Sequence, residues 1–212
     1  MRISELAERT GVPVATIKYY LREGLLPEGE KRTPRLTDYD DRHVRRLELL
    51  RILREVGDVP VDGLKRMVAA TETRGTVHEL FAVAADSLAP TPPAPGPGRE
   101  QSRAMADAII RSAGWDRVRE DSVDRDNLAA TLELIGSFET HPRDPAEIAP
   151  YVDMVDRLAR HEIANLDGTK DRLGLLEEMI VGQVAFATVL TTLRRLAEEH
   201  HSHERFGDDR RD

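Results

Sequence analysis

A run rich in proline and glycine near the middle of the chain places the strongest limit on what it can fold into. Residues 90–98 read Pro-Thr-Pro-Pro-Ala-Pro-Gly-Pro-Gly. Proline lacks a backbone N–H and breaks helices, so this composition favours an extended spacer. We therefore expect residues 90–99 to form an exposed linker with a separately folded region on either side.

The composition of the chain indicates a largely helical protein. Of its 212 residues, 33% are charged and only 4% are aromatic, and the common apolar residues favour helices over a sheet-rich fold. The formal net charge of −8 disfavours nucleic-acid binding by the chain as a whole. However, residues 1–75 contain 15 Lys and Arg against 13 Asp and Glu, whereas the remainder contains 16 against 26. Any contact with DNA phosphates is therefore expected in the N-terminal half.

Two short helices separated by a tight turn are predicted at the N-terminus. Ser4 is a favourable N-cap, and Gly11 can adopt the left-handed backbone that ends a helix. Pro13 is tolerated in the first turn of a second helix, which is expected to run to about Glu23 and to end at Gly24. This arrangement is a helix-turn-helix candidate.

The next segments predict a β-hairpin and further helices. Residues 27–39 combine Pro, Gly and basic residues in a composition that fits a hairpin wing better than a helix. A third helix over 41–57 carries an apolar stripe, and a fourth is expected over about 61–70. Residues 72–89 would form a connecting helix that ends before the linker.

Several short motifs follow one another in the N-terminal third of the chain. They are Ile3-Ser4-Glu5-Leu6-Ala7, Thr10-Gly11-Val12, Thr16-Ile17-Lys18-Tyr19-Tyr20, Gly24-Leu25-Leu26-Pro27 and Tyr39-Asp40-Asp41, the last leading into Val44 and Leu47. In order and spacing these motifs resemble the MerR family of bacterial transcription regulators. The resemblance covers roughly residues 1–71 and implies a winged helix-turn-helix that binds DNA.

The resemblance also implies which side chains face DNA: Thr16, Lys18 and Tyr19 from the second helix, and Arg35 from the wing. Two departures from the family pattern concern these residues. The family usually has Arg at the position of Lys18, and a lysine ammonium cannot make the two-pronged contact of a guanidinium. The common wing pattern of the family, Tyr-Arg-x-Tyr, is replaced here by Pro34-Arg35-Leu36-Thr37-Asp38-Tyr39. The complete set of expected DNA-binding residues is Val14, Thr16, Lys18, Tyr19, Tyr20, Lys31, Arg32 and Arg35.

Structural alternatives exist for some of these residues. The rings of Tyr19 and Tyr20 could both pack in the domain core, and Lys31 and Arg32 could belong to an ordinary solvated turn.

Beyond the linker, four segments with helical periodicity predict an all-α domain over residues 100–200, followed by a flexible tail over 201–212. The segments are 100–113, 124–139, 145–166 and 170–200. The last is apolar on nearly every face between Met179 and Leu190, so one domain core cannot easily cover it. We expect a second copy of the chain to cover the rest, through Ile180, Val184, Phe186 and Leu190.

Other kinds of site have weaker support. The absence of cysteine excludes disulfides and thiolate metal sites. His200-His201-Ser202-His203 could offer ligands to zinc or nickel, but a frayed polar tail is the preferred interpretation. Trp115 could line an effector pocket or simply pack in a core. No catalytic arrangement or phosphate-binding loop has a convincing spacing, so no metal, cofactor or enzymatic activity is expected.

The sequence therefore predicts a mainly α protein: a winged helix-turn-helix with a small β-hairpin wing, and a separate all-α C-terminal helical bundle. The expected function is sequence-specific transcription regulation by a homodimer on an inverted-repeat site in double-stranded promoter DNA. The MerR resemblance implies that distortion of promoter DNA lets RNA polymerase engage it. The C-terminal domain would bind a small organic effector or no ligand. The alternative is a protein-interaction module whose acidic helical domain docks on another regulator.

A cytoplasmic location without membrane contact is also expected. The N-terminus lacks the apolar core of a signal peptide, and the longest apolar stretch, Met179 to Leu190, is too short to span a bilayer.

Overall fold

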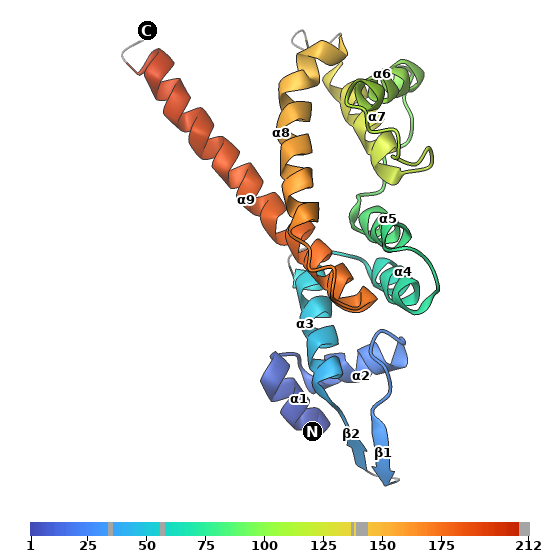
Figure 1. The fold of residues 1–212 in the computed structure, drawn as a ribbon. Helices are drawn as coiled ribbons and strands as arrows, with labels where there is room; N and C mark the ends of the chain where they lie inside the picture. The colour runs from blue at the N-terminus through green and yellow to red at the C-terminus, as the bar shows by residue number, and fades with distance from the viewer. Residues whose placement is uncertain (34–35, 56–57, 137, 139–143, 208–212) are drawn as a thin grey trace. The chain divides into compact units, whose positions relative to one another are not determined.

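The computed structural model describes two compact units. The first unit comprises Met1–Val68 with Leu176–Asp212, and the second comprises Ala69–Leu175. The described residues are mainly helical, with one small antiparallel sheet (Figure 1), which confirms the predicted fold class. The description covers residues 1–212 except 34–35, 56–57, 137, 139–143 and 208–212.

The first helix, α1 (Ile3–Thr10), starts slightly earlier than the sequence predicts. Its N-cap is Arg2 rather than Ser4, and the Arg2 backbone N–H donates to the Glu5 carboxylate at 2.8 Å. The helix ends at Gly11, which has a left-handed φ of 70°. Because glycine has no Cβ, the chain can reverse there without strain.

The second helix, α2 (Val14–Arg22), ends in a Schellman motif. The N–H of Gly24, whose φ is 71°, donates to the Leu21 carbonyl at 3.2 Å, and the N–H of Leu25 donates to the Tyr20 carbonyl at 2.9 Å. These two bonds satisfy carbonyl groups at the helix end and fix the direction in which the chain leaves it.

The predicted wing is a two-stranded antiparallel hairpin formed by β1 (Glu30–Thr33) and β2 (Leu36–Asp38). The start of the chain extends its pairing, since the N-terminal ammonium of Met1 donates to the Tyr39 carbonyl at 2.7 Å and the Tyr39 N–H donates to the Met1 carbonyl at 2.8 Å. The residue after the hairpin is thus fixed to the beginning of α1.

Two further helices, α3 (Asp41–Glu55) and α4 (Val61–Glu72), follow the wing. The guanidinium of Arg54 donates to the Val59 carbonyl at 2.9 Å and so bridges the connection between them. The deepest part of the core in residues 1–68 is almost entirely aliphatic. Its members, each 2% exposed or less, are Leu6, Ile17, Leu25, Leu26, Leu47, Leu50, Leu53, Val59, Leu64 and Met67.

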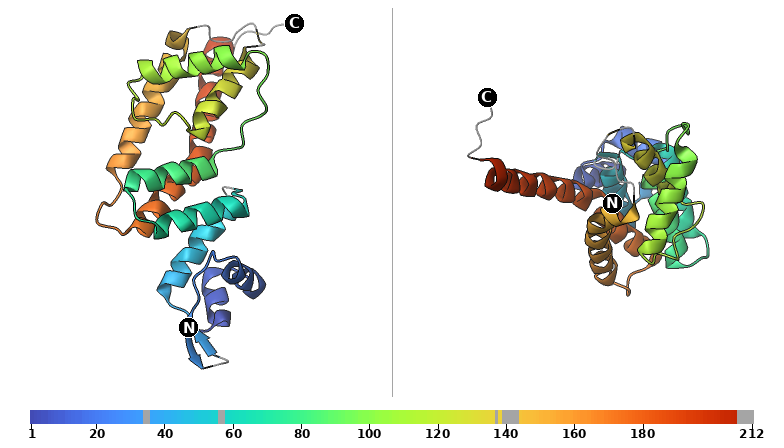
Figure 2. Two further views of the ribbon diagram at one scale, coloured as in Figure 1. Left: turned by 90° about the vertical axis from the view of Figure 1, so that its right-hand side faces the viewer. Right: turned by 90° about the horizontal axis from the view of Figure 1, so that it is seen from above.

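The second unit is built from helices. Its elements are the end of α4, α5 (Val77–Leu88), α6 (Arg99–Ser112), α7 (Val123–Ile135), α8 (Pro145–Ala164) and the first residues of α9. Helices α6 and α7 lie side by side (Figure 2). Their core consists of Ala106, Ile109, Ala129 and Leu132, against which Ile148 and Val152 of α8 pack while partly buried.

The Pro/Gly segment predicted as an inter-domain linker lies within the second unit. It is mostly exposed and lacks helix, but it is held by α7. The carboxylate of Glu133 accepts from the N–H of Gly96 at 3.4 Å and of Gly98 at 3.0 Å, and from Arg99 Nε at 2.9 Å. Glu133 therefore supplies acceptors at the start of α6, where glycine has no capping side chain.

The last helix, α9 (Arg172–Phe206), runs from the second unit into the first. It extends through residues 201–206, where a flexible tail was expected. Among the described helices, α9 is the one whose length and composition would also suit a membrane span. A single such helix is weak evidence, because long core helices of soluble proteins have the same property.

The first residue of α9 joins distant parts of the second unit. The guanidinium of Arg172 donates to the carbonyl of Ala70 at 3.1 Å and to that of Thr76 at 3.2 Å, and it also donates to the Gly75 carbonyl. A single side chain thus bonds the last turns of α4, the start of α5 and the loop between them.

Candidate nucleic-acid interface

Helix α2 buries one face and exposes the other. Ile17 is 0% exposed and Tyr20 is 6% exposed, so these two side chains hold the helix on the core. Burial also raises the pKa of the Tyr20 phenol. The expectation that Tyr20 contacts DNA therefore conflicts with its position, because a ring already packed in the core is not open to a ligand. The other α2 residues expected to bind DNA are not buried: Lys18 is exposed, and Val14, Thr16 and Tyr19 are half-buried.

An arginine not anticipated from the sequence lies beside Tyr19. The Arg22 guanidinium carbon is 5.2 Å from the centroid of the Tyr19 ring, within the range of a cation–π contact. The Arg22 side chain is 71% exposed. The signal was present in the sequence, because residues three apart on a helix are neighbours on its surface.

An ion pair connects the end of α2 to α4. Lys65 Nζ donates to Glu23 Oε2 at 2.8 Å, and Glu23 Oε1 accepts from Arg22 Nε at 3.4 Å. The hydrogen bond from Lys65 is the main cause of a lowered pKa for the Glu23 carboxyl, and the same bond raises the pKa of the Lys65 ammonium. Glu23 therefore lies between a cation of α2 and a cation of α4.

The wing carries acids next to its expected phosphate-binding residues. Glu30 pairs with Asp38 across the two strands, and Arg32 lies 3.1 Å from a carboxylate oxygen of each. Lys31 lies 3.7 Å from the carboxylate of Glu28. Because these acids lower the local positive potential, the wing should attract an anion less strongly than its basic residues alone would.

Arg35, the remaining wing residue expected to bind DNA, lies outside the described residues. Its assignment stays a prediction from the family resemblance.

Asp40 of the Tyr-Asp-Asp motif, two residues after β2, caps α3. Its carboxylate accepts from the Arg42 N–H at 3.0 Å and from Arg42 Nε at 2.9 Å, and lies 2.8 Å from His43 Nδ1. The bond with Arg42 holds the pKa of Asp40 well below its usual range. His43 is 4% exposed, and its ring meets that of Tyr39 edge-on at 5.1 Å. Buried His43 and Tyr39 thus fix the base of the wing, while Asp40 and Arg42 are exposed beside them.

The residues expected at a dimer interface occupy different environments on α9. Ile180 is 0% exposed and Val184 is 9% exposed, so both are already covered within the chain, which corrects their assignment to a surface. Phe186 is 56% exposed and Leu190 is half-buried, so of the four residues Phe186 is the most open to a second subunit. The all-round apolar pattern of this segment could not distinguish the covered side from the open side.

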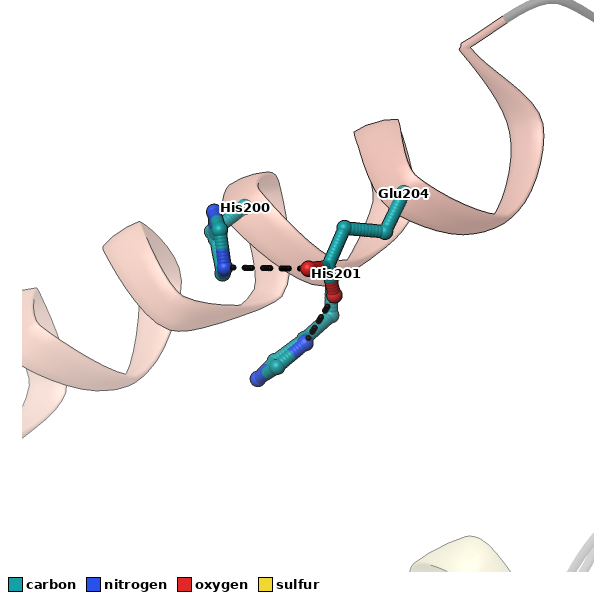
Figure 3. A group of neighbouring side chains, drawn as sticks. All are labelled: His200, His201 and Glu204. Carbon is teal, nitrogen blue, oxygen red and sulfur yellow. Dashed lines mark hydrogen bonds and ion pairs between the residues drawn. The ribbon is translucent and has the colours of Figure 1, made fainter.

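The histidines near the end of α9 lie close to an acid (Figure 3). His200 Nε2 is 3.4 Å and His201 Nδ1 is 2.8 Å from the two carboxylate oxygens of Glu204. All three side chains are exposed on one helix, so solvent competes with any ion for their donor atoms. Their contacts with one another hold the three side chains together.

Trp115 links two helices of the second unit. Its indole N–H donates to Asp156 Oδ1 of α8 at 2.9 Å, and its backbone N–H donates to the Ile110 carbonyl at 3.1 Å at the end of α6. The ring is half-buried. Of the two roles considered for it, a structural role agrees with these contacts.

Comparisons with known proteins agree with the geometry of the N-terminal domain. The model of a family described as "MerR HTH family regulatory protein" matches residues 1–71. The HTH-type transcriptional regulator AdhR of Bacillus subtilis is 32% identical over 57 residues, which are 27% of this chain and 41% of AdhR. The mercuric resistance operon regulatory protein of Bacillus cereus is 41% identical over 56 residues, 26% of this chain and 42% of that protein. The chain thus spans less than half the length of these two relatives.

Two longer similarities extend beyond the N-terminal domain. Nodulation protein NolA of a Bradyrhizobium species is 26% identical over 93% of this chain and 84% of NolA. The crystal structure of SCO5550 from Streptomyces coelicolor A3(2), assigned as a transcriptional regulator, matches with a TM-score of 0.75 and 29% identity over 100% of both chains. The similarity to a solved structure therefore covers both the N-terminal domain and the helical region that follows it.

The buried and exposed faces of α2, together with the hairpin after it, define a winged helix-turn-helix protein. Residues 1–71 form a helix-turn-helix domain of the MerR family, whose members are DNA-binding transcription regulators.

Proposed function

We propose that this chain is a sequence-specific transcription regulator that binds double-stranded promoter DNA through α2 and the wing. The observation that carries the proposal is the two-sided character of α2 in a MerR-type domain: Ile17 anchors the helix, while Lys18 and Tyr19 are accessible on it. A helix held in this way can enter the major groove, where base edges provide specificity and phosphates provide most of the affinity.

The proposed active form is a homodimer. On α9, Phe186, Val189, Leu193 and Leu196 are 56%, 45%, 57% and 56% exposed, and their alternating spacing of three and four residues is that of a helix-pairing seam. Leu190 lies next to this stripe. Two copies related by a two-fold axis would present two α2 helices, which suits an inverted-repeat site.

Regulation is proposed to act through the shape of the promoter. Distortion of the DNA between the two half-sites would bring promoter elements into positions that RNA polymerase can engage. The second unit would sense a small organic effector or act without a ligand, and the protein would work in the cytoplasm, where the promoter is.

A protein-interaction module is the second candidate, and one observation favours it. Tyr151, Met154 and Val155 on α8 are 50%, 39% and 36% exposed, and grouped apolar side chains on a surface are typical of a protein contact. In this case the second unit would dock on another regulator, and binding to DNA would be weak.

The test is a gel-shift series with DNA from upstream of the chain's own gene and an unrelated duplex of equal length, repeated at rising salt. Specific binding with a steep loss of affinity, roughly 0.9 log units per phosphate contact for each log unit of salt, supports the regulator. No binding even at low salt supports the interaction module. Light scattering of Phe186→Glu and Leu193→Glu tests the dimer, and an unchanged mass would contradict the α9 seam.

A further inference from the structure

We propose that Lys65 is a positioning residue for DNA recognition: through Glu23 it fixes the end of α2 and thereby the Tyr19 ring and the Arg22 guanidinium. This inference rests on the proposed function. It concerns residues that all lie in the first unit, and it assigns a role to α4 that the sequence motifs do not suggest.

The first step is the location of Glu23 at the end of the recognition helix. It is the C-cap of α2, and its backbone N–H donates to the Tyr19 carbonyl at 2.9 Å. Its side chain is only 25% exposed, less than that of either cation beside it. The backbone and the carboxylate of Glu23 are thus both held, and movement of either would displace the last turn of α2.

The second step is the ion pair across 42 residues of sequence, in which Lys65 Nζ donates to Glu23 Oε2 at 2.8 Å. The Lys65 side chain is 43% exposed, so the pair is screened, and its effect is expected to be modest. Each partner favours the charged form of the other, because the Glu23 pKa is lowered and the Lys65 pKa is raised by the same bond.

The third step connects the pair to the DNA-facing side chains. The carboxylate of Glu23 also lies 3.4 Å from Arg22 Nε, and the Arg22 guanidinium carbon lies 5.2 Å from the centroid of the Tyr19 ring. With Lys65 present, the negative charge of Glu23 is shared between two cations. Without it, Glu23 would attract Arg22 alone, which would draw the guanidinium toward the carboxylate and leave an acid uncompensated beside the interface.

A direct phosphate contact by Lys65 is the competing explanation, and a double-mutant cycle separates the two. If Lys65 acts through Glu23, Lys65→Met, Glu23→Gln and the double variant should each weaken specific binding by about three- to fivefold, because the pair acts as one unit. The salt dependence of binding should stay that of the wild type. Lys65→Arg keeps the ion pair and is expected to restore binding to within about twofold of the wild type.

The inference is overturned if Lys65→Met weakens binding by the same factor in the wild-type and Glu23→Gln backgrounds and lowers the salt slope by about one, since that result identifies a phosphate contact. Circular dichroism melting of each variant checks that the domain stays folded.

A second readout does not depend on DNA. Tyr19 ring resonances in the nuclear magnetic resonance spectrum of the free protein should shift in Lys65→Met and in Glu23→Gln, while those of Tyr151 in the second unit should not. Absence of a Tyr19 shift contradicts the positioning role even if the proposed function is correct. A Tyr19 shift in a protein that binds no DNA contradicts the proposed function but not the structural coupling.

Discussion

Helices α3 and α8 use their side chains in opposite ways. Helix α3 buries seven of its 15 residues, whereas α8, with 20 residues, buries none among those the structure describes. Apolar residues are not lacking in α8, since Tyr151 and Met154 are exposed on its surface. It contacts the α6–α7 core through Ile148 and Val152, both only partly buried.

The difference shows that apolar residues in a helix do not add to a hydrophobic core unless other elements cover them. Stabilisation depends on the apolar area removed from water, at roughly 25 cal/mol per Å², so α3 contributes far more to its domain than α8 contributes to the second unit. A helix with little buried area opens at low free-energy cost. The buried residues of α3 thus stabilise the N-terminal domain that contains α2. Helix α8, with no buried residue among those described, is suited to rearrangement or to being covered by another surface.

The largest expected effect tests this difference directly. Leu47→Ala removes a side chain that is 0% exposed in α3, and it should lower the free energy of unfolding by about 2–5 kcal/mol. Val152→Ala in α8 should lower it by only about 1 kcal/mol. Chemical denaturation followed by circular dichroism measures both, and equal losses would show that the contrast in burial has no energetic counterpart.

The second effect separates recognition from stability. Tyr19→Ala should weaken specific DNA binding by about tenfold, roughly 1.4 kcal/mol, without lowering the melting temperature. Tyr20→Ala should instead destabilise the domain, because that ring is buried. Tyr151→Ala on α8 is the matched control for loss of an exposed tyrosine and should change neither quantity. Normal affinity in a folded Tyr19→Ala protein would mean that α2 presents a different face to DNA.

A smaller effect concerns the capping of the two helices. Asp40→Ala removes the cap of α3 and should cost about 1 kcal/mol at neutral pH. The Asp40 pKa is lower in the folded protein than in the unfolded chain, so its contribution is present above about pH 4 and is lost as the pH falls toward the folded-state pKa. The stability difference between wild type and variant should therefore shrink on acidification below pH 4.

The corresponding variant at the start of α8 is Asp144→Ala, which removes a bond of 2.8 Å to the Ala146 N–H. It should cost less global stability, because α8 can fray without opening a core. If denaturation shows a larger loss for Asp144→Ala than for Asp40→Ala, the second unit depends on α8 more than its burial suggests.

The smallest expected effect is a gain in DNA affinity. Glu30→Gln removes one of the two acids beside Arg32 in the wing, and it should raise DNA affinity by about two- to threefold at low salt, with less gain at higher salt. Fluorescence anisotropy at two ionic strengths measures this change. Glu147→Gln makes the same charge change on α8, and an equal gain there would indicate an effect of net charge rather than of the wing.

Local signals allowed much of the fold to be predicted from the sequence. Gly11 and Gly24 mark helix ends because the left-handed backbone at these positions favours glycine. The helical segment expected to start at residue 145 does start there, because the side chain of Asp144 accepts from the second helical residue. The motifs in the first 71 residues are also local signals. Each motif is short, and the turns between the helices fix the spacing from one motif to the next, so their order identified the domain.

What the sequence could not provide are the contacts between distant residues. The accessible and buried tyrosines of α2 are adjacent in sequence, and only the position of the core decides which one is covered. The pair of Glu23 with Lys65 and the contact of Glu133 with Gly98 join residues 42 and 35 positions apart, and no local pattern encodes either partner. The same limit explains why Ile180 was assigned to a surface.

The contacts of Arg172 also imply an order of events during synthesis. The carbonyls that it bonds belong to residues 70–76, which emerge from the ribosome about a hundred residues before the arginine does. Chains fold from the N-terminus as they are made, and contacts between distant residues form late. The helices and hairpin of residues 1–68 can therefore form before these bonds of the second unit exist, but the first unit is complete only when α9, the last helix to be made, has joined it.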